Sequence, residues 1–275
     1  MADFSFSKFT SKTTPLDSSS SSSIHFLTFG AGPEYKKSLA QIEKEALQFS
    51  FFDYVHACNE DLLVEDNDFW NQHGKFIVNN PRGYGYWLWK PYIVLRLLDK
   101  IKENDIIVYA DAGCQLNSST IEAKERMNEY VEIARKSPHG ILSFALKHPD
   151  LIDARYTKMD TAVALDIPPL GEFMYSKQLV GGIFVVRKCP YVMELFRSFL
   201  FACTMDNYHN ITDCPSHLTN LPEFKEHRHD QSVFSLLRKK RGTEIIEDET
   251  FFWREGSSWE TNGANFPIWA RRRRY

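Results

Sequence analysis

Short apolar runs alternate along the chain with segments in which apolar residues recur every three or four positions. The first run covers residues 24–29 and ends at Gly30, which predicts a buried strand that enters a loop. The next segment has the spacing of one helical face. Its apolar residues are Tyr35, Leu39, Ile42, Ala46 and Phe49. Strand, loop and helix together predict a first βα unit.

The same alternation continues toward the C-terminus. Further strands are expected at residues 54–57, 105–110, 141–145 and 182–187. Helices are expected to begin at Pro91, at a capping box of Ser119 and Glu122, at Pro190, and near Asp230. Residues 58–71 form a long polar stretch for which no element is expected.

Strands that alternate with helices predict an α/β fold, in which helices cover both faces of a mostly parallel sheet. Ligands of such sheets bind beyond the carboxyl ends of the strands. We therefore expect the chemistry in the loops that follow Phe29, Ala110 and Arg187.

The first 23 residues differ from the rest of the chain. They end in a run of six serines, whose side chains cannot repay the entropy lost on ordering. The sequence predicts a disordered Ser-rich tail at residues 1–23 and a single folded domain at residues 24–275. The arginine run at residues 271–274 is expected to be a solvated tail.

Composition narrows the classes of function. A formal net charge of -3 gives no basic field of the kind that binds nucleic acid without sequence preference. Five dispersed cysteines have no zinc-ligand spacing and are typical of reduced thiols, which favours a cytoplasmic protein. No stretch approaches the roughly 18 apolar residues of a membrane span. We expect neither a nucleic-acid partner nor a membrane span.

The candidate for chemistry with the clearest pattern is Asp111, which follows an apolar strand and precedes Ala112 and Gly113. A carboxylate fixed at a strand end can hold a divalent cation, which neutralises a diphosphate leaving group. Small residues after it allow phosphates to approach the backbone. Aspartate also commonly caps a turn after a strand, so the pattern alone leaves both interpretations open.

The strand followed by Tyr109-Ala110-Asp111-Ala112-Gly113 resembles the DxD region of GT-A glycosyltransferases. The aromatic and glycine-rich segment at residues 82–91 looks like one that precedes this motif in little-characterised bacterial and viral members of the superfamily. The resemblance also reaches glycosyltransferases of large algal DNA viruses, or chloroviruses, which act in the host cytoplasm. It covers residues 24–237 and is concentrated at residues 82–113.

This resemblance implies roles for particular residues. Asp230 would be the catalytic base. The donor would be bound by Thr28, Phe29, Gly30, Arg82, Lys90, Asp111, Ala112, Gly113, Gly181 and Gly182. The acceptor would contact Trp87, Trp89 and Gln231. Purely structural roles are the alternatives. Trp87 and Trp89 could belong to a core aromatic cluster, Gly181 and Gly182 could form a tight turn into a strand, and Asp230 could be an ordinary N-cap.

The sequence departs from the motif at its second carboxylate, where Gly113 stands. The resemblance implies Mn²⁺ or Mg²⁺ as cofactor, with Asp111 and His229 as the metal ligands. Weaker metal binding, or action of Asp111 without a metal, is the alternative that this departure leaves open.

The resemblance implies a metal-assisted transfer of a sugar from a nucleoside-diphosphate donor to a glycan hydroxyl. With Asp230 as the base, this describes an inverting displacement, and a retaining reaction with the same residues stays open. The donor would be UDP-linked, and UDP-xylose is one candidate. Two other functions remain open: a sugar-phosphate nucleotidyltransferase and a non-catalytic carbohydrate-binding domain. The loop at residues 30–34 is poorly suited to the first, because it lacks a basic residue beside its glycines. The pattern does not determine the oligomeric state.

Overall fold

The computed structural model describes residues 10–12, 22–252 and 258–273. The strands are β1 (Thr10–Lys12), β2 (Ile24–Phe29), β3 (Tyr54–Cys58), β4 (Ile106–Ala110), β5 (Gln115–Leu116), β6 (Ile141–Ala145), β7 (Ile183–Arg187), β8 (Glu244–Glu247) and β9 (Ile268–Trp269). The helices are α1 (Pro33–Phe49), α2 (Asp61–Val64), α3 (Asn67–Asn79), α4 (Gly83–Tyr86), α5 (Trp89–Leu98), α6 (Ile121–Lys136), α7 (Asp153–Tyr156), α8 (Met159–Ala164), α9 (Glu172–Tyr175), α10 (Pro190–Tyr208), the 3-10 helix η2 (His209–Ile211) and α11 (His229–Arg241).

The main sheet of the described residues has the strand order β1-β3-β2-β4-β7-β6-β8. Strands β2, β3, β4, β6 and β8 share one direction, while β1 and β7 oppose their neighbours. Five of these seven strands therefore run the same way. A small second sheet joins β5 to β9. The predicted α/β fold with a mostly parallel sheet is confirmed.

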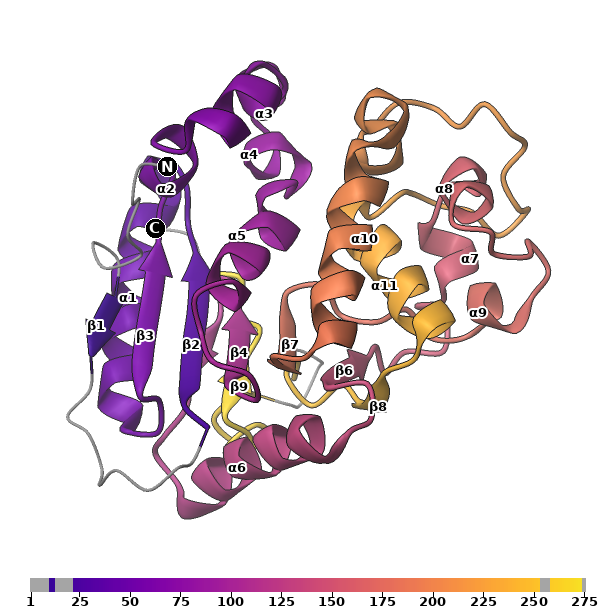
Figure 1. Cartoon of the computed structure of the whole chain (residues 1–275). Helices are drawn as coiled ribbons and strands as arrows, with labels where there is room; N and C mark the ends of the chain where they lie inside the picture. The colour runs from indigo at the N-terminus through magenta and orange to yellow at the C-terminus, as the bar shows by residue number, and fades with distance from the viewer. Residues whose placement is uncertain (1–9, 13–21, 253–257, 274–275) are drawn as a thin grey trace.

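Helices cover both faces of the sheet (Figure 1). Neighbouring side chains of a strand point to opposite faces, so each central strand contributes to two apolar cores. Phe26 and Val108 belong to the core under α1 and α6. Leu27 and Tyr109 belong to the core under α5, α10 and α11. This three-layer packing holds β4, whose end carries Asp111, rigidly in the middle of the molecule.

Strand β7 departs from the expected arrangement. It pairs antiparallel with β4, so Ile183 at its start lies opposite Ala110 at the end of β4. The loop after Arg187 therefore lies beside the start of β4, at the other end of the strands from Asp111. The expectation that this loop carries chemistry is wrong. Gly181 and Gly182, which precede β7, take its place beside Asp111.

Local signals placed some boundaries incorrectly. The hydroxyl of Thr120 accepts the Ala123 N–H at 3.1 Å and caps α6, whereas the hydroxyl of Ser119 donates to Asn117. The predicted cap at Ser119 is therefore wrong by one residue. The polar stretch after β3 forms α2 and α3, the second capped by the side chain of Asp66.

Both ends of the described chain contact the fold. Strand β1, which lies within the predicted N-terminal tail, pairs with β3. Residues 1–9 and 13–21 lie outside the described residues, so their disorder stays a prediction. At the other end, the Arg273 side chain donates to both carboxylate oxygens of Glu45, at 2.8 and 2.9 Å. The Arg273 N–H donates to the Gly113 carbonyl at 2.8 Å. The expectation of a solvated arginine tail is wrong at this residue, because its charge is paired.

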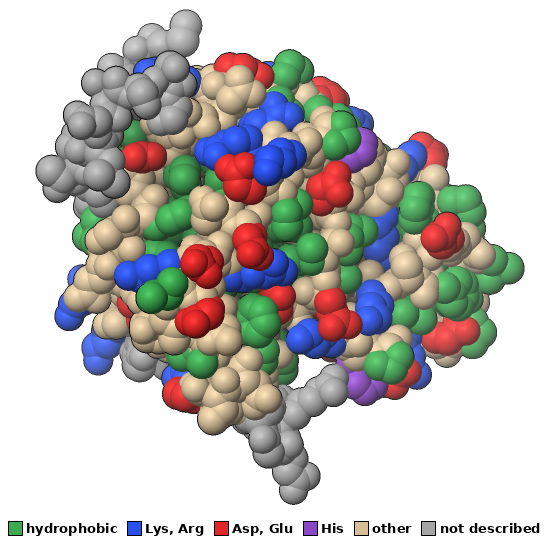
Figure 2. All heavy atoms as spheres, turned by 90° about the horizontal axis from the view of Figure 1, so that it is seen from below, with side chains coloured by type: hydrophobic (Ala, Val, Ile, Leu, Met, Phe, Trp, Pro, Cys, Tyr) green, Lys and Arg blue, Asp and Glu red, His purple; other side chains and the backbone are tan. Residues whose placement is uncertain are grey.

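The face that carries α6 shows acidic and basic side chains next to one another (Figure 2). Two of its ion pairs join the partly buried Arg126 and Glu249 at 2.6 Å and the exposed Lys136 to Glu132 at 3.3 Å. Exposed pairs such as the second contribute little stability each. Among the described residues, no helix combines the length and apolar character that a bilayer crossing requires.

Candidate active site

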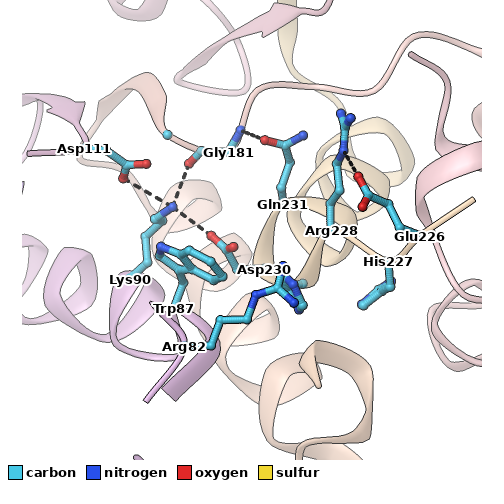
Figure 3. Close-up of a pocket in the computed structure, with 12 residues that line it drawn as sticks. Arg82, Trp87, Lys90, Asp111, Gly181, Glu226, His227, Arg228, Asp230 and Gln231 are labelled. Carbon is cyan, nitrogen blue, oxygen red and sulfur yellow. Dashed lines mark hydrogen bonds and ion pairs between the residues drawn. The ribbon is translucent and has the colours of Figure 1, made fainter. Parts of the chain in front are cut away.

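A cavity opens where the end of β4 meets the segment before β7 and the start of α11 (Figure 3). The space within it, with the open mouth included, is about 610 Å³. The predicted site residues that line it are Arg82, Trp87, Lys90, Asp111, Gly181, Gly182, His229, Asp230 and Gln231. Three further lining residues, to which the sequence analysis gave no role, are Glu226, His227 and Arg228.

Lys90 supplies a buried cation at the floor of this cavity. Its ammonium lies 2.8 Å from Asp230 Oδ2 and 3.4 Å from Asp111 Oδ1, and it donates to the Gly181 carbonyl at 3.2 Å. Burial by itself lowers the pKa of Lys90, but the two carboxylates outweigh this effect and raise it above its ordinary value. Lys90 is therefore charged, and it compensates the buried Asp230 carboxylate, which would be costly to bury alone.

Asp111 is held from two sides. Its N–H donates to the Gly182 carbonyl at 2.9 Å, and the Tyr109 hydroxyl donates to its Oδ1 at 2.7 Å. Burial and then the Asp111 charge raise the pKa of Tyr109 well above its usual range, so the phenol stays protonated and remains a donor. Together with Lys90, this leaves Oδ2 of Asp111 beside Gly182.

The close approach of Gly182 to Asp111 gives a testable prediction. A methyl group on Gly182 would lie 2.4 Å from Asp111 Oδ2, and the carboxylate cannot rotate without loosening its bonds to Tyr109 and Lys90. We expect Gly182→Ala to weaken the binding of a ligand that occupies this cavity by roughly tenfold or more, about 1.4 kcal/mol, in isothermal titration calorimetry.

Gly171→Ala is the matched control for this prediction. Its added methyl group would meet the Pro168 carbonyl oxygen at 3.0 Å, outside the cavity lining. We expect its affinity for a ligand of the cavity to stay within about twofold of that of the unmodified protein. Equal losses in the two variants would contradict the placement of the cavity.

Residues 83–87 form a left-handed turn. The φ angles of Tyr84, Tyr86 and Trp87 are 52°, 51° and 61°, a region that costs a non-glycine residue roughly 1–2 kcal/mol. Gly83 and Gly85 occupy the other two positions of the turn with little strain. A Cβ on Gly83 would also lie 2.5 Å from the Trp87 ring. The backbone conformation therefore accounts for the glycines of this aromatic segment.

The two tryptophans of this segment have different surroundings. Trp87 lines the cavity and stacks on His229, with 5.4 Å between ring centroids. Trp89 is buried, stacks on Phe29 at 4.1 Å and donates to the Gly83 carbonyl. Trp89 is a core residue outside the cavity lining, so the cavity supports the predicted acceptor contact for Trp87 and not for Trp89.

Arg82 forms a contact that the sequence gave no reason to expect. Its guanidinium donates to both carboxylate oxygens of Asp213 at 2.9 Å, and the Tyr86 hydroxyl donates to the same carboxylate at 2.8 Å. Burial alone would raise the pKa of Asp213, but these hydrogen bonds outweigh it and lower the pKa. Asp213 is separated from Arg82 by 131 positions and matches no motif, which explains why it was missed.

The start of α11 places two ionisable groups at the cavity. Burial raises the pKa of Asp230 above its ordinary value, and Lys90 offsets this only in part. Burial lowers the pKa of His229, whose Nδ1 lies 2.8 Å from the Ile211 carbonyl oxygen. Asp230 therefore has a greater proton affinity than an ordinary aspartate, which suits a general base.

A hydrogen-bonded chain connects the cavity to a buried ion pair. The Gly181 N–H donates to Gln231 Oε1 at 3.0 Å, and Gln231 Nε2 donates to Gln178 Oε1 at 2.7 Å. Gln178 Nε2 in turn donates at 2.9 Å to the fully buried Asp153, which pairs with Lys239 at 2.8 Å. Gln231 and Gly181 are thus fixed from the interior.

Several residues predicted to bind the donor lie outside the cavity lining. They are Thr28, Phe29, Gly30, Ala112 and Gly113. Thr28 is fully buried, and a Cβ on Gly30 would lie 3.3 Å from Ala112, so this loop packs closely against the segment after β4. The donor roles of these five residues stay predictions.

The predicted metal ligands are Asp111 and His229. Within the described chain they form no group with a third His, Cys, Asp or Glu whose ligand atoms all lie within 4.8 Å of one another. The Lys90 ammonium is 3.4 Å from Asp111 Oδ1, and like charges at about 4 Å repel by about 4 kcal/mol per unit charge near a protein surface. The residues present do not fit a divalent ion held by this pair.

A group with the composition of a metal site occurs elsewhere. Asp160, His209 and His217 place ligand atoms within 4.8 Å of one another, outside the cavity lining. Asp160 Oδ2 lies 2.6 Å from His209 Nε2 and accepts the His217 N–H at 2.7 Å, while Oδ1 accepts the Leu218 N–H at 2.9 Å. These bonds tie α8 to the segment before α11.

Asp160 gives a prediction for acid stability. Burial alone raises its pKa, but the hydrogen bonds from His217, His209 and Leu218 lower it from 3.8 to about 2. Because the folded value lies below the unfolded one, the stabilisation is present above about pH 4 and is lost as the pH falls toward 2. We expect Asp160→Asn to lower the free energy of unfolding at pH 7 by about 2 kcal/mol. Urea denaturation at pH 7 and pH 3 measures this; an equal loss at both pH values would contradict it.

Neither a protein-family model nor a curated protein matches the sequence. Among solved structures, the chain is similar to a glycosyltransferase involved in the glycosylation of the major capsid of PBCV-1, with a TM-score of 0.46 and 11% identity over 90% of this chain and 91% of that chain. It is also similar to mouse xyloside xylosyltransferase 1 in its apo form, with a TM-score of 0.43 and 14% identity over 90% of this chain and 84% of that chain.

Both of these structures are glycosyltransferases, the class that the segment at residues 82–113 resembles. Neither comparison gives this chain a donor, an acceptor or a residue role.

Proposed function

We propose that the protein transfers a glycosyl group from a nucleoside-diphosphate sugar to a hydroxyl of a glycan acceptor. The observation that carries this proposal is the Lys90 ammonium held between Asp111 and Asp230 at the floor of an open cavity, with Arg82 also in its lining. Such a site combines a carboxylate of raised proton affinity, held in place by Lys90, with the Arg82 guanidinium, which can stabilise a leaving diphosphate. The sequence resemblance at residues 82–113 supports the same reaction.

In the proposed reaction, Asp230 accepts the proton of the acceptor hydroxyl as that oxygen forms a bond to the anomeric carbon. The bond between the anomeric carbon and the diphosphate oxygen breaks, and the departing oxygen keeps the electron pair. Lys90 orients Asp230 and Asp111, while Arg82 stabilises charge on the diphosphate. A single displacement of this kind inverts the anomeric configuration.

The donor is proposed to be UDP-linked, with UDP-xylose as one candidate. Trp87 offers an aromatic face in the cavity on which the CH groups of a sugar can pack, and Gln231 offers a fixed amide. The Mn²⁺ or Mg²⁺ that the resemblance implies would take Asp111 and His229 as ligands; no step of the proposed reaction passes through it, because this pair does not fit such an ion.

A panel of nucleotide sugars tests the proposal. A ligand that binds only the folded state raises the melting temperature, so thermal shift identifies the donor, and release of nucleoside diphosphate then measures turnover. Binding with turnover supports the transferase. Binding without turnover, with any glycan acceptor tried, favours a carbohydrate-binding domain instead, and no binding at all contradicts both.

A further inference from the structure

Two arginines from distant parts of the chain line the same cavity. Arg82 precedes the left-handed turn, and Arg228 precedes α11 (Figure 3). Arg228 stacks over the Tyr156 ring, 3.5 Å from its centroid, which fixes the side chain while leaving its charge unchanged.

The carboxylate partners of both arginines are exposed, and Arg228 also donates to the buried Gln178 Oε1 at 3.4 Å. Asp213, the partner of Arg82, has a side chain that is 49% exposed, and Glu226, 3.6 Å from Arg228, is 63% exposed. Ion pairs with exposed carboxylates are weak, so a more highly charged anion can displace these partners. Arg82 and Arg228 are therefore available to a ligand.

Lys90 is not available in the same way. An ammonium has three donors, and those of Lys90 face Asp111, Asp230 and the Gly181 carbonyl. Its single positive charge is opposed by two carboxylates. Lys90 thus organises the floor of the cavity and has no donor left for a phosphate.

The position at which the DxD motif would place a second metal ligand offers no side chain for an ion. Gly113 has no side chain, and its carbonyl accepts the Arg273 N–H. His229 directs Nδ1 toward the Ile211 carbonyl, while its buried Nε2 has no hydrogen-bond partner and lies 3.7 Å from Asp213. Lys90 already occupies the space between Asp111 and Asp230 that a bridging ion would need.

We propose that Arg82 and Arg228 bind the donor diphosphate and that this binding needs no divalent ion, since Lys90 fills the position between the two carboxylates. The inference rests on the proposed function, because it states how the same cavity holds its donor. A guanidinium suits this task, because its fork of donors matches phosphate oxygens and its charge does not depend on pH.

Calorimetric titration of the unmodified protein with UDP, GDP and ADP tests the inference directly. Each titration is made in EDTA, in MnCl₂ and in MgCl₂. The expected result is a Kd for the tightest nucleotide that agrees within about threefold among the three buffers. A Kd that is roughly tenfold or more lower with either metal overturns the inference and leaves the glycosyltransferase proposal standing. Absence of binding in every buffer overturns both.

Variants separate the two arginines from the general charge of the protein. We expect Arg82→Gln and Arg228→Gln each to raise the Kd in EDTA by roughly tenfold or more. Arg197→Gln, an exposed arginine of α10 outside the cavity lining, is expected to leave the Kd unchanged. Melting temperatures show which variants fold. If a variant does not fold, the titrations of the unmodified protein in EDTA, MnCl₂ and MgCl₂ still test whether binding needs a divalent ion. Folded variants with unchanged Kd overturn the inference.

Discussion

Replacement of Asp230 by asparagine is expected to reduce turnover by roughly 10²–10⁴-fold, the usual contribution of a general base. Asparagine keeps the shape of the side chain but cannot accept the acceptor proton. Lys90 retains Asp111 and the Gly181 carbonyl as partners, so the variant should fold. Initial rates with the identified donor measure the effect, and nucleotide affinity is expected to change much less.

The pH profile distinguishes loss of a base from loss of structure. Burial raises the pKa of Asp230, so the base becomes protonated, and turnover falls, at a higher pH than for an ordinary aspartate. The residual activity of the asparagine variant should lack this acid limb. Asp166→Asn, at a side chain that is 89% exposed, is the matched control and should retain full activity. An Asp230→Asn variant with normal turnover would place the base elsewhere.

Replacement of Asp153 by alanine is expected to lower the free energy of unfolding by about 3–5 kcal/mol, the usual cost of removing one partner of a buried pair. Asp153 is fully buried and accepts hydrogen bonds from Thr157, Gln178 and Ser235 as well as Lys239. Its loss would leave the Lys239 ammonium, with a side chain only 4% exposed, without a carboxylate. Urea denaturation at pH 7 measures the change.

Two further variants make this prediction specific. Asp150→Ala removes an exposed ion pair to Arg155 and should cost less than about 1 kcal/mol. The double variant Asp153→Leu and Lys239→Met should recover part of the loss, because it removes both charges of the ion pair. A loss at Asp153→Ala no larger than that at Asp150→Ala would contradict the role of this buried pair.

The elements that sequence reasoning found are those with local signals. The apolar run of β2 and the β-branched run of β4 predicted their strands, and the three- and four-residue spacing predicted α1. The cavity brings Asp111 and Asp230 together as the resemblance implied, although 119 positions separate them (230 − 111). A family resemblance can relate two residues that are far apart in sequence, because it assigns both of them to the same site.

The features that were missed depend on contacts that no local pattern encodes. The direction of β7 is set by its pairing with β4 and cannot be inferred from the residues of the strand. Asp213 lies in an irregular segment, and only the fold brings it to Arg82. Tyr109 is different, because residues two apart on a strand face the same side, so its bond to Asp111 could have been predicted.

The docking of Arg273 onto Gly113 offers a way to observe the cavity from outside it. The amide hydrogen of Arg273 is bonded to a carbonyl two residues beyond Asp111, yet Arg273 does not line the cavity. Its exchange with deuterium therefore reports how often the loop after β4 opens. A nucleotide that stiffens this loop would slow the exchange, so a single backbone signal could follow occupancy without a label on the ligand.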